Sequence, residues 1–170
     1  MSSTQTTNDT PELVLMMGLP AAGKGYVGEQ LFGNTHQFID CDSIKESHTD
    51  YNPAEPQVLH AWSQIVCAEQ MMELFNNPTN AVYDSTGTDT DRMSNYIQMA
   101  HDAGMTTRLV FVDVSIETSI NRNQNRVIRE GQTVARVVPE IVIRNKAAQI
   151  YEAYNVVSQL TTDIQRVLNE

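Results

Sequence analysis

The sequence predicts an α/β fold, in which a parallel β-sheet carries helices on both of its faces. Short apolar runs of strand length alternate with longer segments whose apolar residues recur at helical spacing. Strands that alternate with helices are joined by right-handed crossovers and pair in parallel. Polar turns follow three of the runs, and such sheets bind ligands at the carboxyl ends of their strands. We therefore expect these turns to form one functional site.

Four strands and five helices are expected along the chain. The strands are Leu13–Met17, Gln37–Ile39, Ala81–Tyr83 and Thr107–Val114. The helices are Tyr26–Phe32, Gln57–Phe75, Asp89–Ala103, Ser115–Asn125 and a long final one that Pro139 opens and that includes Tyr154. Within the second helix, the apolar spacing places Trp62, Met71 and Met72 in the core.

The length of 170 residues and the ordinary apolar and charged content predict one globular domain over residues 12–170. Residues 1–11 are polar and lack the apolar core and basic flank of a signal peptide, so we expect a flexible tail. Cys41 and Cys67 indicate neither a disulfide framework nor a metal site. No run is long enough to span a membrane. The simplest interpretation is a cytoplasmic protein.

Basic residues are concentrated in one segment of an acidic chain. The net charge at pH 7 is −10, yet six of the eleven Lys and Arg residues lie between Arg122 and Lys146. Only Glu130 and Glu140 oppose them there, so this segment carries +4 and the remainder carries −14. Such a distribution is typical of a protein that binds phosphate at one place. The alternative is a solvated helix face.

A phosphate-binding pattern follows the first expected strand. Residues 18–24 match G-x-x-x-x-G-K, in which glycines let backbone N–H groups surround an anion at the positive end of the next helix. Lys24 is expected to contact the β- and γ-phosphates of ATP. The alternative is a glycine-rich turn with a solvated lysine. The residues predicted to bind ATP in this loop are Gly18, Leu19, Pro20, Ala21, Ala22, Gly23, Lys24, Gly25 and Tyr26.

The loop departs from the usual pattern at Gly25. Most such loops place Ser or Thr after the lysine, and that hydroxyl binds Mg²⁺. Magnesium keeps several waters in such sites. We therefore expect water, Asp42 or Asp84 to take the missing ligand position. The prediction is that ATP and Mg²⁺ are cofactors, with weakened or rearranged metal binding.

Three further motifs accompany the loop. They are Phe38-Ile-Asp-Cys-Asp42-Ser-Ile-Lys45, Val82-Tyr-Asp84-Ser-Thr86 with Arg92, and Arg122-Asn123-x-x-Arg126 followed by Val138-Pro139. Together with the loop, they resemble the P-loop kinases related to polynucleotide 5′-kinase, including the kinase domain of the T-even phage end-repair enzyme. The resemblance covers Leu13 to Tyr154. It implies a three-layer P-loop kinase fold with an arginine-bearing lid, residues 122–138, that is longer than the lid of the T-even enzyme.

The resemblance also implies the roles of the residues that match these motifs. Asp42 is expected to act as the catalytic base that accepts the proton of the attacking hydroxyl. Lys24, Arg122 and Arg126 are expected to neutralise charge on the transferred phosphoryl group. The two arginines are also expected to bind ATP.

A second group of matching residues is implied in acceptor binding. These residues are Lys45, Asp84, Thr86, Arg92 and Arg129. Alternatives remain open for several positions. Asp42 is also a candidate helix N-cap, with Asp40 as the competing catalytic carboxylate. Asp84 is also a candidate turn residue, and Arg92 is a candidate solvated helix residue.

The predicted function is an ATP-dependent kinase that phosphorylates a hydroxyl on nucleic acid, with DNA as the expected substrate and no membrane partner. The acceptor is either a 5′-hydroxyl end or the hydroxymethyl group of 5-hydroxymethyluracil, because bacteriophage DNA-modification kinases resemble the same family. A phage-encoded protein of this kind acts in the host cytoplasm. One alternative is a small-molecule or nucleoside kinase on the same fold. The other is a nucleotide-binding module that has lost catalysis, as Gly25 would indicate.

Overall fold

The computed structural model describes residues 10–128 and 135–170, and its centre is a five-stranded parallel β-sheet. The strand order is β2-β3-β1-β4-β5, and every pair of neighbours is parallel. The predicted α/β class is therefore confirmed. The strands are β1 (Glu12–Met17), β2 (Gln37–Asp40), β3 (Ala81–Asp84), β4 (Thr106–Asp113) and β5 (Asp163–Leu168).

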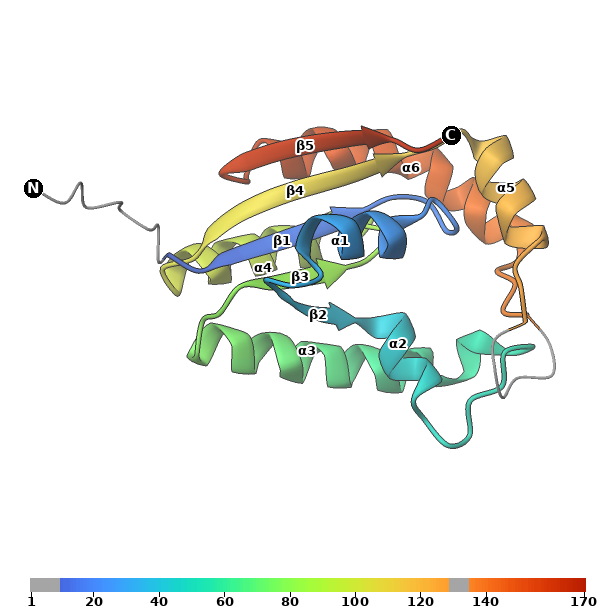
Figure 1. The fold of residues 1–170 in the computed structure, drawn as a ribbon, viewed down its shortest axis with the longest axis horizontal. Coiled ribbons are helices and arrows are strands. Elements are labelled where there is room, and N and C mark those ends of the chain that lie inside the picture. Colours follow the sequence, from blue (N-terminus) through green and yellow to red (C-terminus); the bar gives the residue numbers. More distant parts are fainter. Residues whose placement is uncertain (1–9, 129–134) are drawn as a thin grey trace, which may run out of the picture.

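Helices pack on both faces of the sheet and along its β2 side (Figure 1). Helix α1 lies in front of the sheet in this view, α4 and α6 lie behind it, and α3 follows the β2 side. Helices α2 and α5 stand at the end to which all strands point. The helix bounds are α1 (Lys24–Phe32), α2 (Cys41–Glu46), η1 (Pro56–Leu59), α3 (His60–Asn76), α4 (Thr90–Asp102), α5 (Ile116–Gln124) and α6 (Glu140–Ser158).

The central strands form where the sequence has continuous apolar runs. Residues 13–17 of β1 are all fully buried, because β1 lies between β3 and β4 and has helices over both faces. A parallel strand in this position needs apolar side chains on both of its faces. All four predicted strands are present.

Strand β5 was not predicted, because its sequence Asp-Ile-Gln-Arg-Val-Leu contains no apolar run. The strand lies at the edge of the sheet, and its residues are exposed or half-buried. Contacts with β4 hold it: Arg166 forms an ion pair with Asp113, and its guanidinium lies 5.6 Å from the ring centroid of Phe111. Such long-range contacts have no local signature in the sequence.

Two expectations for the second predicted helix were wrong. Met71 is fully buried, but Trp62 is 38% exposed and Met72 is 46% exposed. Adjacent residues are about 100° apart around a helix, since it has about 3.6 residues per turn. The inward face of α3 contains Cys67, Met71 and Leu74, so Met72 lies off that face.

In the part of the chain that the structure describes, no helix combines the length and apolar character that a membrane crossing requires.

Gly87, in the turn after β3, gives a test of packing at the carboxyl end of the sheet. Gly87 and Gly104 both have a positive φ, +84° and +83°. A Cβ on Gly87 would lie 2.4 Å from the Cβ of Met17, whereas a Cβ on Gly104 would meet nothing within 4 Å. We expect Gly87→Ala to reduce the free energy of unfolding by about 1–3 kcal/mol more than Gly104→Ala does. Urea denaturation measures this difference, and equal losses would contradict the packing argument.

Candidate active site

The loop after β1 is held in place by its backbone contacts with the neighbouring strands. The Gly18 N–H donates to the Thr86 carbonyl oxygen at 3.1 Å, and a Cβ on Gly18 would lie 2.6 Å from the carbonyl oxygen of Val112. Ala21 and Gly23 have φ values of 58° and 93°. Left-handed residues of this kind turn successive N–H groups toward one side, which makes a concavity for an anion.

Lys24 opens α1 and lies over this loop. Its Nζ donates to the carbonyl oxygens of Gly18 and Leu19 at 3.1 and 3.2 Å. The ammonium group therefore sits at the loop and at the N-terminal end of α1, where an anion would also be attracted by the helix dipole. The loop fits a phosphate chain by its backbone geometry and by this lysine.

Gly25 is not required by packing. It lies inside the first turn of α1, and a Cβ at this position would meet nothing within 4 Å. The side chain of Tyr26 is 69% exposed. A serine side chain would therefore fit at position 25, and the absence of a hydroxyl is a property of the site rather than a steric necessity.

The two carboxylates after β2 have different surroundings. Asp40 is the N-cap of α2: its Oδ1 accepts from the Asp42 N–H at 2.9 Å, and its Oδ2 accepts from the Ser43 hydroxyl at 2.9 Å. Asp42 lies in the first turn of that helix, so the alternative that Asp42 is the N-cap is wrong. Hydrogen bonds occupy both oxygens of Asp40, whereas the Asp42 side chain is 57% exposed and faces cations.

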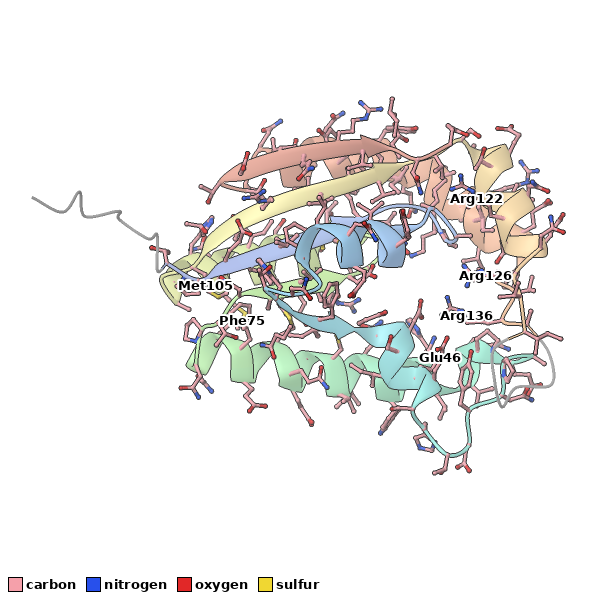
Figure 2. The ribbon with its side chains drawn as sticks, viewed as in Figure 1. Glu46, Phe75, Met105, Arg122, Arg126 and Arg136 are labelled. Atoms are coloured by element: carbon pink, nitrogen blue, oxygen red, sulfur yellow. The ribbon has the colours of Figure 1, made fainter. Side chains whose placement is uncertain are left out.

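Arg136 is the main partner of Asp42, although no individual role was predicted for it. Its Nη1 lies 3.0 Å from Asp42 Oδ2 and 3.4 Å from Glu46 Oε1, and its Nε is buried with no hydrogen-bond partner among the described residues. Figure 2 shows Arg122, Arg126 and Arg136 one below another, with Glu46 close to Arg136. In the sequence, Arg136 was visible only as one member of the basic segment, because its pairing with α2 is a long-range contact.

Lys45 is a buried cation on the other side of Asp42. Its side chain is 8% exposed, and its Nζ lies 3.8 Å from Asp42 Oδ1 and 3.4 Å from His60 Nδ1. Burial and the Lys45 charge hold the pKa of His60 below its usual value, which favours a neutral ring that accepts from the lysine. Lys45 thus offers a buried positive charge next to Asp42, with no carboxylate within tight hydrogen-bond distance among the described residues.

The cations decide the charge of Asp42. Partial desolvation by the surrounding protein opposes ionisation, although the side chain remains largely exposed. The charges of Arg136, Lys45 and Lys24 outweigh that effect and hold the pKa of Asp42 below its ordinary value. Asp42 is therefore an ionised carboxylate at neutral pH.

Asp84, at the end of β3, has a raised pKa, in contrast to the lowered pKa of Asp42. Its pKa is raised to about 7, mainly by burial and also by the negative charges of Asp40 and Asp42, while Lys24 acts in the other direction. Asp84 pairs in register with Asp40 of β2 and Met16 of β1, so it lies beside the loop. It is a carboxyl group that exchanges its proton near neutral pH.

The remaining residues assigned to the acceptor side are less closely grouped. The Thr86 carbonyl holds Gly18, and the hydroxyl of Thr88 accepts from Lys146 Nζ at 3.0 Å. The Arg92 side chain lies 3.6 Å from Asp89, which caps α4, and it is 40% exposed. Arg92 thus has a structural partner, as the solvated-helix alternative expects, while its charge acts on His60.

Asn123 ties the end of the lid segment to α5. The side chain of this buried residue donates to the Val138 carbonyl oxygen at 2.7 Å and accepts from the Val138 N–H at 2.9 Å. Because Arg136 precedes Val138 by two residues, this pair of hydrogen bonds also sets where Arg136 can reach. The Asn of the R-N-x-x-R motif therefore has a positioning role that the sequence did not reveal.

Arg122 lies next to the phosphate-binding loop. It donates to the carbonyl oxygens of Ala22 at 3.4 Å and of Asn169 at 2.6 Å, and Asn169 itself donates to Ala22 at 2.8 Å. Arg126 follows α5 on the same side of the molecule (Figure 2). The predicted acceptor residue Arg129 lies outside the described residues.

The residues fit ATP better than they fit a protein-bound metal ion. In residues 10–128 and 135–170, no three His, Cys, Asp or Glu side chains form a group that could hold a metal. The charge of the loop lysine acts on both predicted ligands, Asp42 and Asp84, and favours their ionised forms. A magnesium ion at this loop would take most of its ligands from ATP phosphates and water, with these carboxylates as the protein contribution.

The fold and this loop define a P-loop kinase-like protein, and the comparison with protein families makes the assignment narrower. Residues 1–169 match the Zeta toxin family, so the chain belongs to that family. Comparison with curated proteins found no match. The P-loop kinase part of the sequence-based assignment is thus supported, whereas the polynucleotide kinase family is not confirmed.

Solved structures share the fold at low identity. AvrRxo1-ORF1:AvrRxo1-ORF2 with sulphate ions superposes with a TM-score of 0.70 at 17% identity, over 88% of this chain and 50% of that one. The PezAT chromosomal toxin–antitoxin system of Streptococcus pneumoniae gives 0.69 at 15%, over 94% and 68%. The Pnkp1/Rnl/Hen1 RNA repair complex gives 0.67 at 12%, over 91% and 48%. The chain therefore spans about half the length of several structures that it matches.

The open space at Gly25 allows a direct test of the missing hydroxyl. We expect Gly25→Ser to fold normally and to bind ATP more tightly when Mg²⁺ is present, because the new hydroxyl can act as a metal ligand. Gly25→Ala is the matched control, since it adds the same Cβ without the oxygen. Calorimetric titration with ATP, with and without Mg²⁺, separates the two effects. An equal gain in both variants would show that the hydroxyl does not reach the metal.

The raised pKa of Asp84 predicts a pH dependence of stability. The folded protein favours the protonated carboxyl, so its stability falls as the pH rises from the ordinary value of 3.8 to about 7, and then levels off. Asp84→Asn removes this contribution and should stabilise the protein by about 2–4 kcal/mol at a pH well above 7. Urea denaturation in EDTA at about pH 5 and about pH 8 measures the change. Asp91→Asn, at an exposed position of α4, is the control; an equal slope for both variants would contradict the prediction.

Proposed function

We propose that the protein is an ATP-dependent kinase that transfers the γ-phosphate to a hydroxyl of a phosphate-bearing acceptor. One observation carries this proposal: Asp42 is an ionised carboxylate surrounded by positive charge. The buried Lys45 and Arg136 contact its two oxygens, and the charge of Lys24 in the phosphate-binding loop also acts on it. A module that only binds nucleotide needs neither a carboxylate at this place nor a buried cation behind it.

Each residue around the loop has a part in such a reaction. Asp42 accepts the proton of the acceptor hydroxyl, as a positioned carboxylate can. Lys24 and the arginines on the lid side neutralise negative charge that develops on the transferred group. ATP supplies that group, and Mg²⁺ bound to its phosphates would add positive charge. Arg136 holds Asp42 in place by its ion pair and is near enough to exchange this partner for a phosphate oxygen.

Lys45 indicates the chemistry of the acceptor. A buried ammonium without a close carboxylate is costly unless an anion compensates for it. Among the described residues, Lys45 contacts His60 and the more distant Asp42, so a phosphate of the acceptor would complete its surroundings. A free nucleotide and the end of a nucleic acid both place a hydroxyl close to a phosphate.

Of these two kinds of acceptor, a small phosphorylated molecule fits the charge distribution of the chain better than a nucleic acid does. Outside the segment between Arg122 and Lys146 the chain carries −14, which disfavours long contacts with a nucleic acid backbone. The DNA acceptor that the sequence predicted remains the second candidate. It is favoured by that basic segment and by the similarity to a structure described as an RNA repair complex.

Transfer of labelled γ-phosphate from ATP to a panel of acceptors tests the proposal. The panel contains nucleoside monophosphates, nucleotide sugars, DNA with a free 5′-hydroxyl, and 5′-blocked DNA with and without 5-hydroxymethyluracil. Label on a small nucleotide supports a small phosphorylated acceptor. Label on the DNA with a free 5′-hydroxyl or on the DNA with 5-hydroxymethyluracil supports a nucleic acid acceptor. If ATP binds but no acceptor is labelled, the proposed transfer is wrong.

Replacement of Asp42 separates a kinase from a nucleotide-binding module. We expect Asp42→Asn to lower the rate of transfer by about 10²–10⁴-fold, because the general base is lost, while the affinity for ATP stays similar. Asp91→Asn is again the control, because its carboxylate is exposed and distant from the loop in sequence. Single-turnover transfer and equilibrium binding of ATP measure the two effects. A variant with unchanged transfer would exclude Asp42 as the base.

A further inference from the structure

The candidate base is next to a pair of cysteines that the proposed reaction does not use. Cys41 is the first residue of α2 and precedes Asp42 directly. Its Sγ donates to the Ser63 carbonyl oxygen of α3 at 3.7 Å. Cys67 lies one helical turn beyond Ser63 on the same face of α3, and the two thiols interact with each other. Residues far apart in the sequence thus place two thiols together beside Asp42.

The two thiols differ in their access to solvent. Cys41 is half-buried at the start of α2, whereas Cys67 is 1% exposed in the core between α3 and the sheet. An oxidant in solution therefore meets Cys41 first. Cys67 is the neighbour that can react with an oxidised Cys41, as the resolving thiol of a redox pair does.

We propose that Cys41 and Cys67 form a reversible intramolecular disulfide on exposure to a peroxide, and that this bond stops phosphate transfer. The Cys41 sulfur attacks the O–O bond of hydrogen peroxide, which yields a sulfenic acid and releases water. The Cys67 sulfur then attacks the sulfenic sulfur, the S–S bond forms, and the hydroxyl leaves with the thiol proton as a second water. Both thiols are oxidised and the peroxide is reduced. A dithiol reductant reverses the bond by exchange.

The disulfide is expected to slow phosphate transfer because it forms beside Asp42. This inference rests on the proposed role of Asp42 as the catalytic base. Covalently linked sulfurs are about 2 Å apart, much closer than thiols in contact. Closing this distance draws the first turn of α2 toward α3, and Asp42 belongs to that turn. We expect the transfer rate to fall by about 100-fold, which is the loss that a displacement of about 1 Å at a reacting group can cause.

Intact-mass analysis of the full chain tests the bond without any assumption about function. After treatment with hydrogen peroxide, we expect the mass to fall by two hydrogens and a proteolytic digest to contain Cys41 and Cys67 in one linked peptide. Dithiothreitol should restore both free thiols. Cys41 oxidised alone to sulfinic acid, both thiols still open to alkylation, or a disulfide between two chains would each overturn the proposal.

Activity measurements then test the consequence of the bond. Transfer, or hydrolysis of ATP if the acceptor is not yet known, should fall in the oxidised protein and recover with dithiothreitol. Cys67→Ser should be as active as the original protein before oxidation. Without the second thiol, excess peroxide should carry Cys41 on to sulfinic acid, which dithiothreitol does not reduce, so activity should not recover. A disulfide that leaves the rate unchanged would overturn the switch but not the kinase. If the reduced protein shows no transfer, although peroxide still forms the disulfide, the proposed function rather than the disulfide would be overturned.

Discussion

The backbone at Gly18 is closely packed between two neighbouring strands, and the arrangement of the site depends on it. Its N–H binds the turn after β3, and the carbonyl of Val112 in β4 leaves no room for a Cβ. The chain leaves β1 at this point and must turn at once into the loop that ends at Lys24. Because β1 lies between β3 and β4, the carboxyl ends of three strands meet where the loop begins. A close approach of three backbones thus brings phosphate-binding groups and carboxylates together.

Charge balance gives the carboxylates of this site different states. Asp40 is used by its own helix as a cap, Asp42 is ionised beside cations, and burial keeps Asp84 close to its protonated form. Asp42 stays ionised because it pairs with Lys45 and Arg136, whereas the buried Asp84 keeps its proton up to about pH 7. The surroundings of each carboxyl, rather than its residue type, therefore decide what it can do.

The segment after α5 connects the two sides of the site. Arg122 reaches the phosphate-binding loop, and Arg136 reaches α2. Between them, Asn123 binds the backbone of Val138 and thereby limits the path of the chain that carries Arg136. Membership of the Zeta toxin family and the shared fold agree with a nucleotide-dependent phosphotransferase. The acceptor side that we propose, where Lys45 lies, is formed by α2 and its neighbours rather than by the loop.

The sequence by itself determined the α/β class, four of the five strands and the position of the loop, because continuous apolar runs and glycine spacing act over a few residues. It also indicated Asp42 and the arginine-rich segment as candidates. Only the tertiary structure decided that Asp40 caps α2, that β5 extends the sheet and that Arg136 pairs with Asp42. It also brought Cys41 next to α3. These contacts join residues from different elements, and their energies depend on packing and burial, which no local pattern in the sequence records.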